Sequence, residues 1–246
     1  TGLMTKLHNA KYRFGFTGTL DGSKTHKWVL EGLFGDCNHV TKTDDLIKQG
    51  HLSKFRIKVL LCKHPPQYLD NYQDEIDYLV SHVGRNNLIK NLVKDLEGNT
   101  LVLFNYIEKH GEPLFNLINN SILAPRKSFF VHGGTDVEDR EQVRQITEEE
   151  HNAIIVASYG TFSTGINIKR LHNIVFASPS KSRIRNLQSI GRVLRRGEGK
   201  TIATLYDIAD DIGGQNYTIK HLNERVNIYN EENFKYEVIK INLKVG

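Results

Sequence analysis

The sequence predicts an α/β fold with a mostly parallel sheet, and three observations carry this prediction. Short apolar runs alternate with longer segments whose apolar residues recur at helical spacing, as in repeated strand-helix-strand units. Runs such as residues 153–157 are apolar throughout, which is typical of central strands covered on both faces. The chain has 246 residues, 39% of them hydrophobic, which is enough for two modest α/β domains.

The expected strands and helices follow one another along the chain. Strands are predicted at residues 12–16, 38–42, 55–62, 100–104, 127–131, 153–157, 173–176, 201–206 and 236–243. Helices are predicted at residues 25–33, 43–49, 70–82, 86–97, 107–119, 136–148, 181–194 and 217–232. Because parallel strands end at the same edge of a sheet, we expect ligands to bind at the carboxyl ends of these strands.

The segment from Cys62 to Asp70 interrupts this alternation with two adjacent prolines, Pro65 and Pro66. Such a segment is typical of a linker between domains. The chain also opens without a methionine, inside a helix-like pattern that leads directly into the first predicted strand. We therefore expect a fragment of a longer protein.

Composition narrows the classes of function. The longest apolar runs are far shorter than the roughly 18 to 20 residues that cross a bilayer, so no membrane partner is expected. Cys37 and Cys62 stand in different contexts, which indicates buried thiols in a reducing compartment rather than a metal or disulfide framework. Lysine and arginine number 33 against 28 acidic residues, a mild bias toward polyanions that is concentrated between residues 181 and 200.

This basic segment has the pattern of an amphipathic helix. At about 100° per residue, Gln188, Arg192 and Arg195 lie within about 60° of one another, opposite an apolar face. This polar face of the helix, taken alone, is compatible with a solvated surface or with a binding surface. Gly191, in the middle of the helix, costs about 1 kcal/mol relative to alanine, which favours close approach of another backbone or a ligand.

Two segments imitate nucleotide-binding motifs. Gly199-Lys200-Thr201 ends like a phosphate loop, but Leu194 occupies the position of the loop's first glycine, and the segment follows a helix and precedes a strand. We expect a helix end there. Residues 74–77 spell Asp-Glu-Ile-Asp, but the apolar spacing that follows predicts the start of a helix with a solvated acidic face. Neither a phosphate loop nor a metal-binding carboxylate is therefore expected in this chain.

Five segments resemble motifs of the superfamily-two helicases, and they occur in the family order. Residues 188–196, QSIGRVLRR, are similar to motif VI. The others are FTGTL (16–20) for motif III, LVLFNYIEKHGEPL (101–114) for motif IV, FFVHGGTDVEDREQV (129–143) for motif IVa, and ASYGTFSTGINI (157–168) for motif V. The resemblance covers essentially the whole chain and is closest to phage members of the family that act on branched DNA.

The resemblance implies a parallel-sheet, RecA-like helicase C-terminal lobe, preceded by the last βα units of the N-terminal RecA-like lobe. It divides the chain into a remnant of the first, ATP-binding lobe at residues 1–62, a linker with helices at 63–98, and the second lobe at 99–246. Motifs I and II, which hold ATP and Mg²⁺ in the family, would lie in a missing N-terminal half. The chain alone is therefore expected to be inactive.

The resemblance also implies roles for individual residues. Arg195 would be the arginine finger and Arg192 its companion, both stabilising charge on the transferred phosphoryl group. The other implied roles are cofactor binding by Gly165, Asn167 and Gln188; nucleic-acid backbone binding by Asn105, His132, Gly133, Ser158 and Thr161; and coupling between lobes by Thr17, Gly18 and Thr19.

The implied function is that of an ATP-dependent DNA helicase, which unwinds or remodels junctions, forks and R-loops in phage recombination, repair and replication control. Its partners would be branched DNA, RNA–DNA hybrids and the N-terminal half of the same protein, in the host cytoplasm, with a monomer favoured. The sequence leaves one alternative open, a non-catalytic module that binds nucleic acid through the basic helix at residues 181–196.

Overall fold

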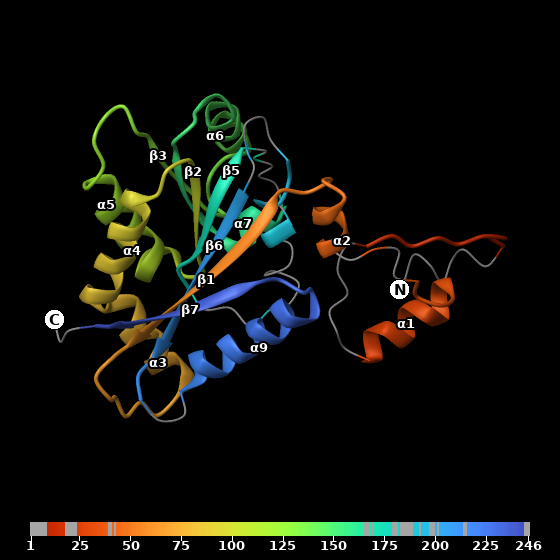
Figure 1. The fold of residues 1–246 in the computed structure, drawn as a ribbon, viewed down its shortest axis with the longest axis horizontal. Coiled ribbons are helices and arrows are strands. Elements are labelled where there is room, and N and C mark those ends of the chain that lie inside the picture. The colour runs from red at the N-terminus through yellow and green to blue at the C-terminus, as the bar shows by residue number, and fades with distance from the viewer. Residues whose placement is uncertain are drawn as a thin grey trace.

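Seven strands form one sheet in the computed structural model, in the order β3-β4-β2-β5-β6-β1-β7, and every neighbouring pair is parallel (Figure 1). The structure describes residues 9–17, 24–38, 41, 43–164, 168, 170–178, 182, 189–191, 193–196, 200, 202–213 and 216–243. The strands are β1 (Lys54–Lys63), β2 (Asn99–Phe104), β3 (Ser128–Val131), β4 (Ile154–Ser158), β5 (Leu171–Phe176), β6 (Ile202–Asp211) and β7 (Tyr236–Asn242). The predicted α/β class and parallel sheet are confirmed.

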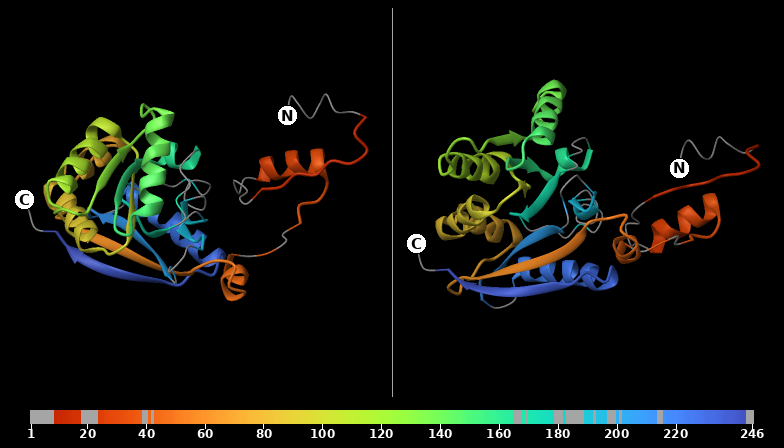
Figure 2. Two further views of the ribbon diagram at one scale, coloured as in Figure 1. Left: turned by 90° about the horizontal axis from the view of Figure 1, so that it is seen from above. Right: turned by 45° about the horizontal axis from the view of Figure 1, so that its top comes forward.

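Helices cover both faces of this sheet (Figure 2). The helices of the described residues are α1 (Lys24–Phe34), α2 (Thr43–Lys48), α3 (Tyr72–Ser81), α4 (Val83–Asp95), the π-helix η2 (Ile107–Gly111), α5 (Glu112–Asn119), α6 (Val137–Glu149), α7 (Tyr159–Thr164) and α9 (Tyr217–Glu231), and α1 lies away from the sheet. Side chains of α6, α7 and α9 pack into one core and those of α4 and α5 into a second.

Each central strand supplies side chains to both cores. In β2, Leu101 and Leu103 belong to one core, whereas Val102 and Phe104 belong to the other. This division follows from the strand geometry, because successive side chains point to opposite faces of a sheet. All residues of β4 are buried, which confirms the interpretation of residues 153–157 as a strand covered on both faces.

The position of β1 corrects the predicted domain division at residue 62. β1 lies between β6 and β7, and its residues Lys54 to Lys63 are in register with Ile202 to Asp211 of β6. Residues 54–62 were expected in the first lobe, yet they belong to the same sheet as residues 99–242. The strand pattern could not reveal this, because its hydrogen-bonding partners lie far away in the sequence.

The strand predicted at residues 12–16 is not formed. Residues 12–17 pair with no strand in the described part of the chain, and Tyr12, Phe14 and Phe16 are 70%, 74% and 93% exposed. An aromatic-rich run makes a strand only where a neighbour satisfies its backbone groups and covers one face. The strand predicted at 38–42 lies partly outside the described residues.

Residues 74–77 begin a helix, as predicted, since α3 starts at Tyr72 and is capped by the side chain of Asn71. The expectation of a solvated acidic face is wrong for Glu75, which is only 2% exposed. Its carboxylate accepts hydrogen bonds from the backbone N–H groups of Tyr217 and Thr218 at 2.8 and 2.7 Å. Glu75 therefore caps the beginning of α9 and joins it to α3.

The expectations from composition can also be compared with the structure. Cys62 is buried in the second core, and burial raises the pKa of its thiol to about 12, whereas Cys37 is only half-buried. No helix among the described residues is long and apolar enough to cross a membrane.

Candidate nucleic-acid interface

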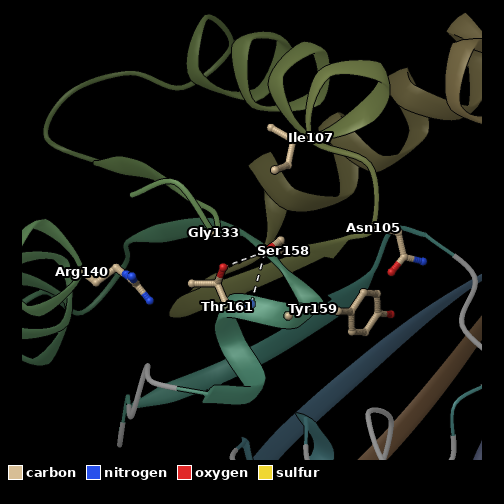
Figure 3. A pocket seen from close by; sticks show the side chains of 8 residues that line it. Asn105, Ile107, Gly133, Arg140, Ser158, Tyr159 and Thr161 are labelled. Atoms are coloured by element: carbon tan, nitrogen blue, oxygen red, sulfur yellow. Dashed lines mark hydrogen bonds between the residues drawn. The ribbon is translucent and has the colours of Figure 1, made fainter. Parts of the chain in front are cut away.

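A pocket of about 470 Å³ opens where three adjacent strands, β3, β4 and β2, reach their carboxyl ends (Figure 3). It is lined by Asn105, Ile107, Gly133, Arg140, Ser158, Tyr159, Gly160 and Thr161. Four of the five residues predicted to bind the nucleic-acid backbone thus lie around one pocket. The parallel sheet explains the convergence, because the segments that follow its strands all emerge at one edge.

Ser158 and Thr161 form a hydroxyl pair on one wall of the pocket. Ser158 is the last residue of β4, and its Oγ lies 2.8 Å from Thr161 Oγ1. The backbone N–H of Thr161 donates to Ser158 Oγ at 3.3 Å, which ties the strand end to the first turn of α7. This helix was not predicted, because its sequence, YGTFST, is short and rich in poor helix formers.

Asn105, directly after β2, and Ile107, the first residue of η2, line the pocket. Gly111 lets the end of η2 approach the sheet closely, since a Cβ at this position would lie 2.5 Å from the ring of Phe104. Short π-helical turns are frequent at functional sites, where they shift the side chains that follow.

His132 is the one predicted backbone-binding residue that does not line the pocket. Its Nδ1 accepts a hydrogen bond from the N–H of Gly134 at 3.1 Å, and its ring packs on Phe130 with centroids 5.2 Å apart. The backbone N–H of His132 donates to Thr135 Oγ1 at 3.0 Å. His132 therefore shapes the turn that presents Gly133 to the pocket.

Arg140 is a pocket residue that the sequence analysis missed. Its Nε donates to the carbonyl oxygen of Thr135 at 2.9 Å, which anchors the guanidinium beside Gly133. Its position within the segment that resembles motif IVa was the available signal, but the surrounding acidic residues of α6 made it look like part of a solvated face.

The chemistry of the pocket suits an anion. Its walls offer hydroxyl groups, an amide, backbone N–H groups and one guanidinium, and none of its lining residues carries a carboxylate. Such donors bind phosphate oxygens without distinguishing bases. The described part of the chain contains no cluster of three His, Cys, Asp or Glu side chains that could hold a metal ion.

The predicted nucleotide-binding residues are described only in part. Arg192, Gln188, Gly165 and Asn167, like Gly18 and Thr19, lie outside the described residues, while Thr17 is exposed. Arg195 is also exposed, and its backbone is held by a bridge to Leu52.

Lys200 holds the end of the segment that carries Arg195. Its buried Nζ donates to the carbonyl oxygens of Val193 and Arg195, the latter at 2.9 Å, and β6 begins two residues later. Burial lowers the pKa of Lys200 to about 8. Lys200 thus contacts the end of the preceding helical segment, while Gly199 and Thr201 lie outside the described residues.

Comparison with known proteins supports this description. Residues 84–197 match the family model of the helicase conserved C-terminal domain. The ATP-dependent DNA helicase UvsW of Enterobacteria phage T4 is 33% identical over 99% of this chain, and the chain spans about half of that relative, 52% of its length.

Solved structures agree with the family match. The crystal structure of T4 UvsW superposes with a TM-score of 0.66 at 32% identity, covering 89% of this chain and 46% of that one. The Saccharomyces cerevisiae protein Dbp5 shares the fold, with a TM-score of 0.55 at 12% identity over 92% of this chain and 49% of its own. By sequence and fold, this chain is similar to the phage T4 helicase UvsW, and its residues 84–197 match the helicase conserved C-terminal domain.

Proposed function

We propose that the chain is the C-terminal part of an ATP-dependent superfamily-two DNA helicase or translocase that remodels branched DNA. The observation that carries the proposal is the phosphate-binding chemistry of the pocket at the ends of β3, β4 and β2. In this proposal Asn105, Gly133, Ser158 and Thr161 bind the backbone of one DNA strand, and His132 orders the turn beside them. Junctions, forks and R-loops in phage recombination, repair and replication control are the substrates, in the host cytoplasm.

Arg195 and Arg192 act in this proposal as arginine fingers on ATP, with Gln188, Gly165 and Asn167 beside the nucleotide. The anchored backbone and exposed side chain of Arg195 support this role, since a finger must reach a phosphate held by another lobe. ATP and Mg²⁺ would be held mainly by an N-terminal half of the protein. A finger of this kind contributes about 10³- to 10⁵-fold to the rate.

Residues 1–53 would be the last part of the first lobe, with Thr17, Gly18 and Thr19 coupling the two lobes. The exposed rings of Tyr12, Phe14 and Phe16, together with Trp28 at 66%, support a covering by further protein. The second lobe would then comprise residues 54–246, because β1 belongs to its sheet and α4 packs into one of its cores.

The pocket is tested by measuring the binding of fluorescently labelled forked DNA to this chain by anisotropy over a range of salt concentrations. We expect weak affinity that falls steeply with salt and depends little on base sequence, because phosphate contacts dominate. Binding that is insensitive to salt, or absent at low salt, would contradict the proposal.

The nucleotide role is tested in the longer protein that includes the N-terminal half. ATP turnover stimulated by branched DNA should fall by about 10³-fold or more in an Arg195→Ala variant. Undiminished turnover would exclude the finger and favour the alternative, a non-catalytic nucleic-acid-binding module.

A further inference from the structure

Ser178 lies directly behind the pocket and contacts two of its walls. The backbone N–H of Asn105 donates to Ser178 Oγ at 3.3 Å, and the hydroxyl of Tyr159 donates to the carbonyl oxygen of Ser178 at 3.2 Å. Asn105 and Tyr159 line the pocket, whereas Ser178 is 1% exposed and does not. One buried residue therefore contacts both Asn105, which follows β2, and Tyr159, the first residue of α7.

The backbone of Ser178 is itself fixed by the sheet. β5 pairs with β2, and the pairing continues past Phe176, because the N–H groups of Ala177 and Ser178 donate to the carbonyl oxygen of Leu103 at 3.0 and 3.3 Å. Ser178, the second residue after β5, is thereby held next to Asn105, the first residue after β2.

His110, on η2, contacts Ser178 from the other side. Its Nδ1 lies 2.9 Å from Ser178 Oγ, and the imidazole is completely buried. Burial and the nearby charge of Arg85 lower the pKa of His110 to about 3, so the ring is neutral. The hydroxyl of Ser178 therefore forms hydrogen bonds with both the backbone N–H of Asn105 and Nδ1 of His110, which orients both partners.

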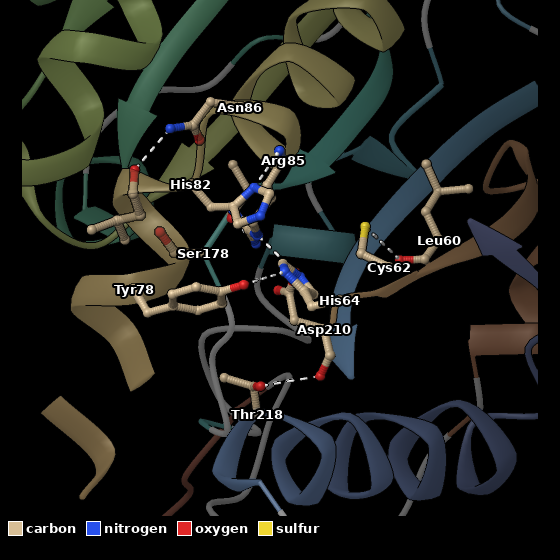
Figure 4. A network of polar contacts seen from close by, with 12 residues as sticks. Leu60, Cys62, His64, Tyr78, His82, Arg85, Asn86, Ser178, Asp210 and Thr218 are labelled. Atoms are coloured by element: carbon tan, nitrogen blue, oxygen red, sulfur yellow. Dashed lines mark hydrogen bonds and ion pairs between the residues drawn. The ribbon is translucent and has the colours of Figure 1, made fainter. Parts of the chain in front are cut away.

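A buried ion pair between Arg85 and Asp210 holds the residue before Ser178 in place (Figure 4). Arg85 Nη2 donates to the carbonyl oxygen of Ala177 at 2.8 Å, and Arg85 Nε donates to Asp210 Oδ1 at 2.8 Å. His64 Nε2 lies 2.9 Å from the same carboxylate oxygen. Burying an arginine costs several kcal/mol unless its partners are well placed, so this contact fixes α4, β6 and residue 177 relative to one another.

We propose that Ser178 is a positioning residue for the nucleic-acid pocket, acting through the backbone of Asn105 and the ring of Tyr159 without touching the nucleic acid. The inference rests on the proposed function of the pocket. It predicts that a buried hydroxyl, outside the pocket, controls how tightly the chain binds nucleic acid.

The test is a double-mutant cycle on DNA binding by this chain, with Ser178→Ala, Asn105→Ala and the double variant. Ser178→Ala should weaken binding of a labelled single strand by roughly fivefold, the equivalent of one hydrogen bond. The slope of log affinity against log salt should stay unchanged, because Ser178 and Asn105 are uncharged and the loss of their contacts does not alter counterion release. In the Asn105→Ala background the effect of Ser178→Ala should be much smaller.

Asn173→Ala is the matched control. Asn173 lies near the other end of β5, where its buried amide donates to Glu97 O at 2.8 Å and Thr100 Oγ1 at 3.2 Å. The Asn173→Ala substitution should lower the thermal stability of the chain but leave its affinity for DNA and the salt slope unchanged. His110→Gln, which removes the second contact of Ser178 Oγ, should act in the same direction as Ser178→Ala and provides a second variant that perturbs Ser178.

The outcomes distinguish a failure of the positioning role of Ser178 from a failure of the proposed function of the pocket. Wild-type affinity in folded Ser178→Ala or His110→Gln would overturn the positioning role, as would an equal loss of affinity in Asn173→Ala. If a variant with both Ser158→Ala and Thr161→Val also bound like the wild type, the proposed function of the pocket would fail instead.

Discussion

The hydroxyl oxygens of Ser158 and Thr161 lie 2.8 Å apart, one at the end of β4 and the other in the first turn of α7. Two residues that were predicted separately as phosphate contacts therefore share one hydrogen bond. Groups that share a hydrogen bond do not contribute independently.

We expect Ser158→Ala and Thr161→Val each to weaken DNA binding by roughly fivefold, and the double variant to lose little more than either single variant. Anisotropy titrations with one labelled strand measure all three affinities. Losses that multiply would show that the two hydroxyl groups contact the ligand independently.

Arg140 should supply one ionic contact to the bound strand. Replacing it by alanine should make the salt dependence of binding shallower by roughly 0.7 in the log-log slope. Arg144 is the matched control, because it lies one turn further along α6 and pairs with Glu141 and Glu148 instead of lining the pocket. An equal change of slope in Arg144→Ala would assign the effect to general surface charge.

The buried pair of Arg85 and Asp210 should dominate the stability of the region behind the pocket. Although burial opposes ionisation, the charge of Arg85 and the hydrogen bonds from His64 and Arg85 lower the pKa of Asp210 to about 2. Asp210→Asn leaves a buried guanidinium without a counter-charge and should lower the free energy of unfolding by about 3 to 5 kcal/mol.

Urea denaturation measures this loss in the free energy of unfolding, and Asp211→Asn is the control. Asp211 is the next residue along β6, and it pairs with Lys63 at a partly exposed position. Its replacement should cost at most about 1 kcal/mol. A similar loss of unfolding free energy in both variants would contradict the claim that burial makes the contribution of Asp210 large.

His110 should make the chain sensitive to moderate acid. Its pKa is about 3 in the folded chain, below the usual value near 6.5, so the unfolded state binds more protons at intermediate pH. The free energy of unfolding should therefore fall as the pH drops below about 6.5, by up to about 1.4 kcal/mol per pH unit.

Urea denaturation at pH 7 and pH 5 measures this effect, because most unpaired carboxylates remain ionised over that range. His110→Gln should flatten the pH dependence, while replacement of the exposed His151 by glutamine should leave it unchanged. An unchanged pH dependence in His110→Gln would exclude His110 as its origin.

The sequence by itself determined most of the described elements from residue 43 onward, α7 excepted, and most of the pocket. Apolar spacing identified the strands, and the resemblance to helicase motifs implied that Asn105, Gly133 and Ser158 contact nucleic acid. All three follow predicted strands, and segments that follow parallel strands emerge at one edge of a sheet.

Only the tertiary structure decided which segments meet. The pairing of β1 with β6, the burial of Glu75 against α9 and the contact of Ser178 with Asn105 each join residues more than 70 positions apart. Arg140 likewise looked like part of a solvated acidic helix until the fold turned it toward the pocket. Local sequence fixes the direction in which a side chain points along its own element, but its partner depends on how the whole chain packs.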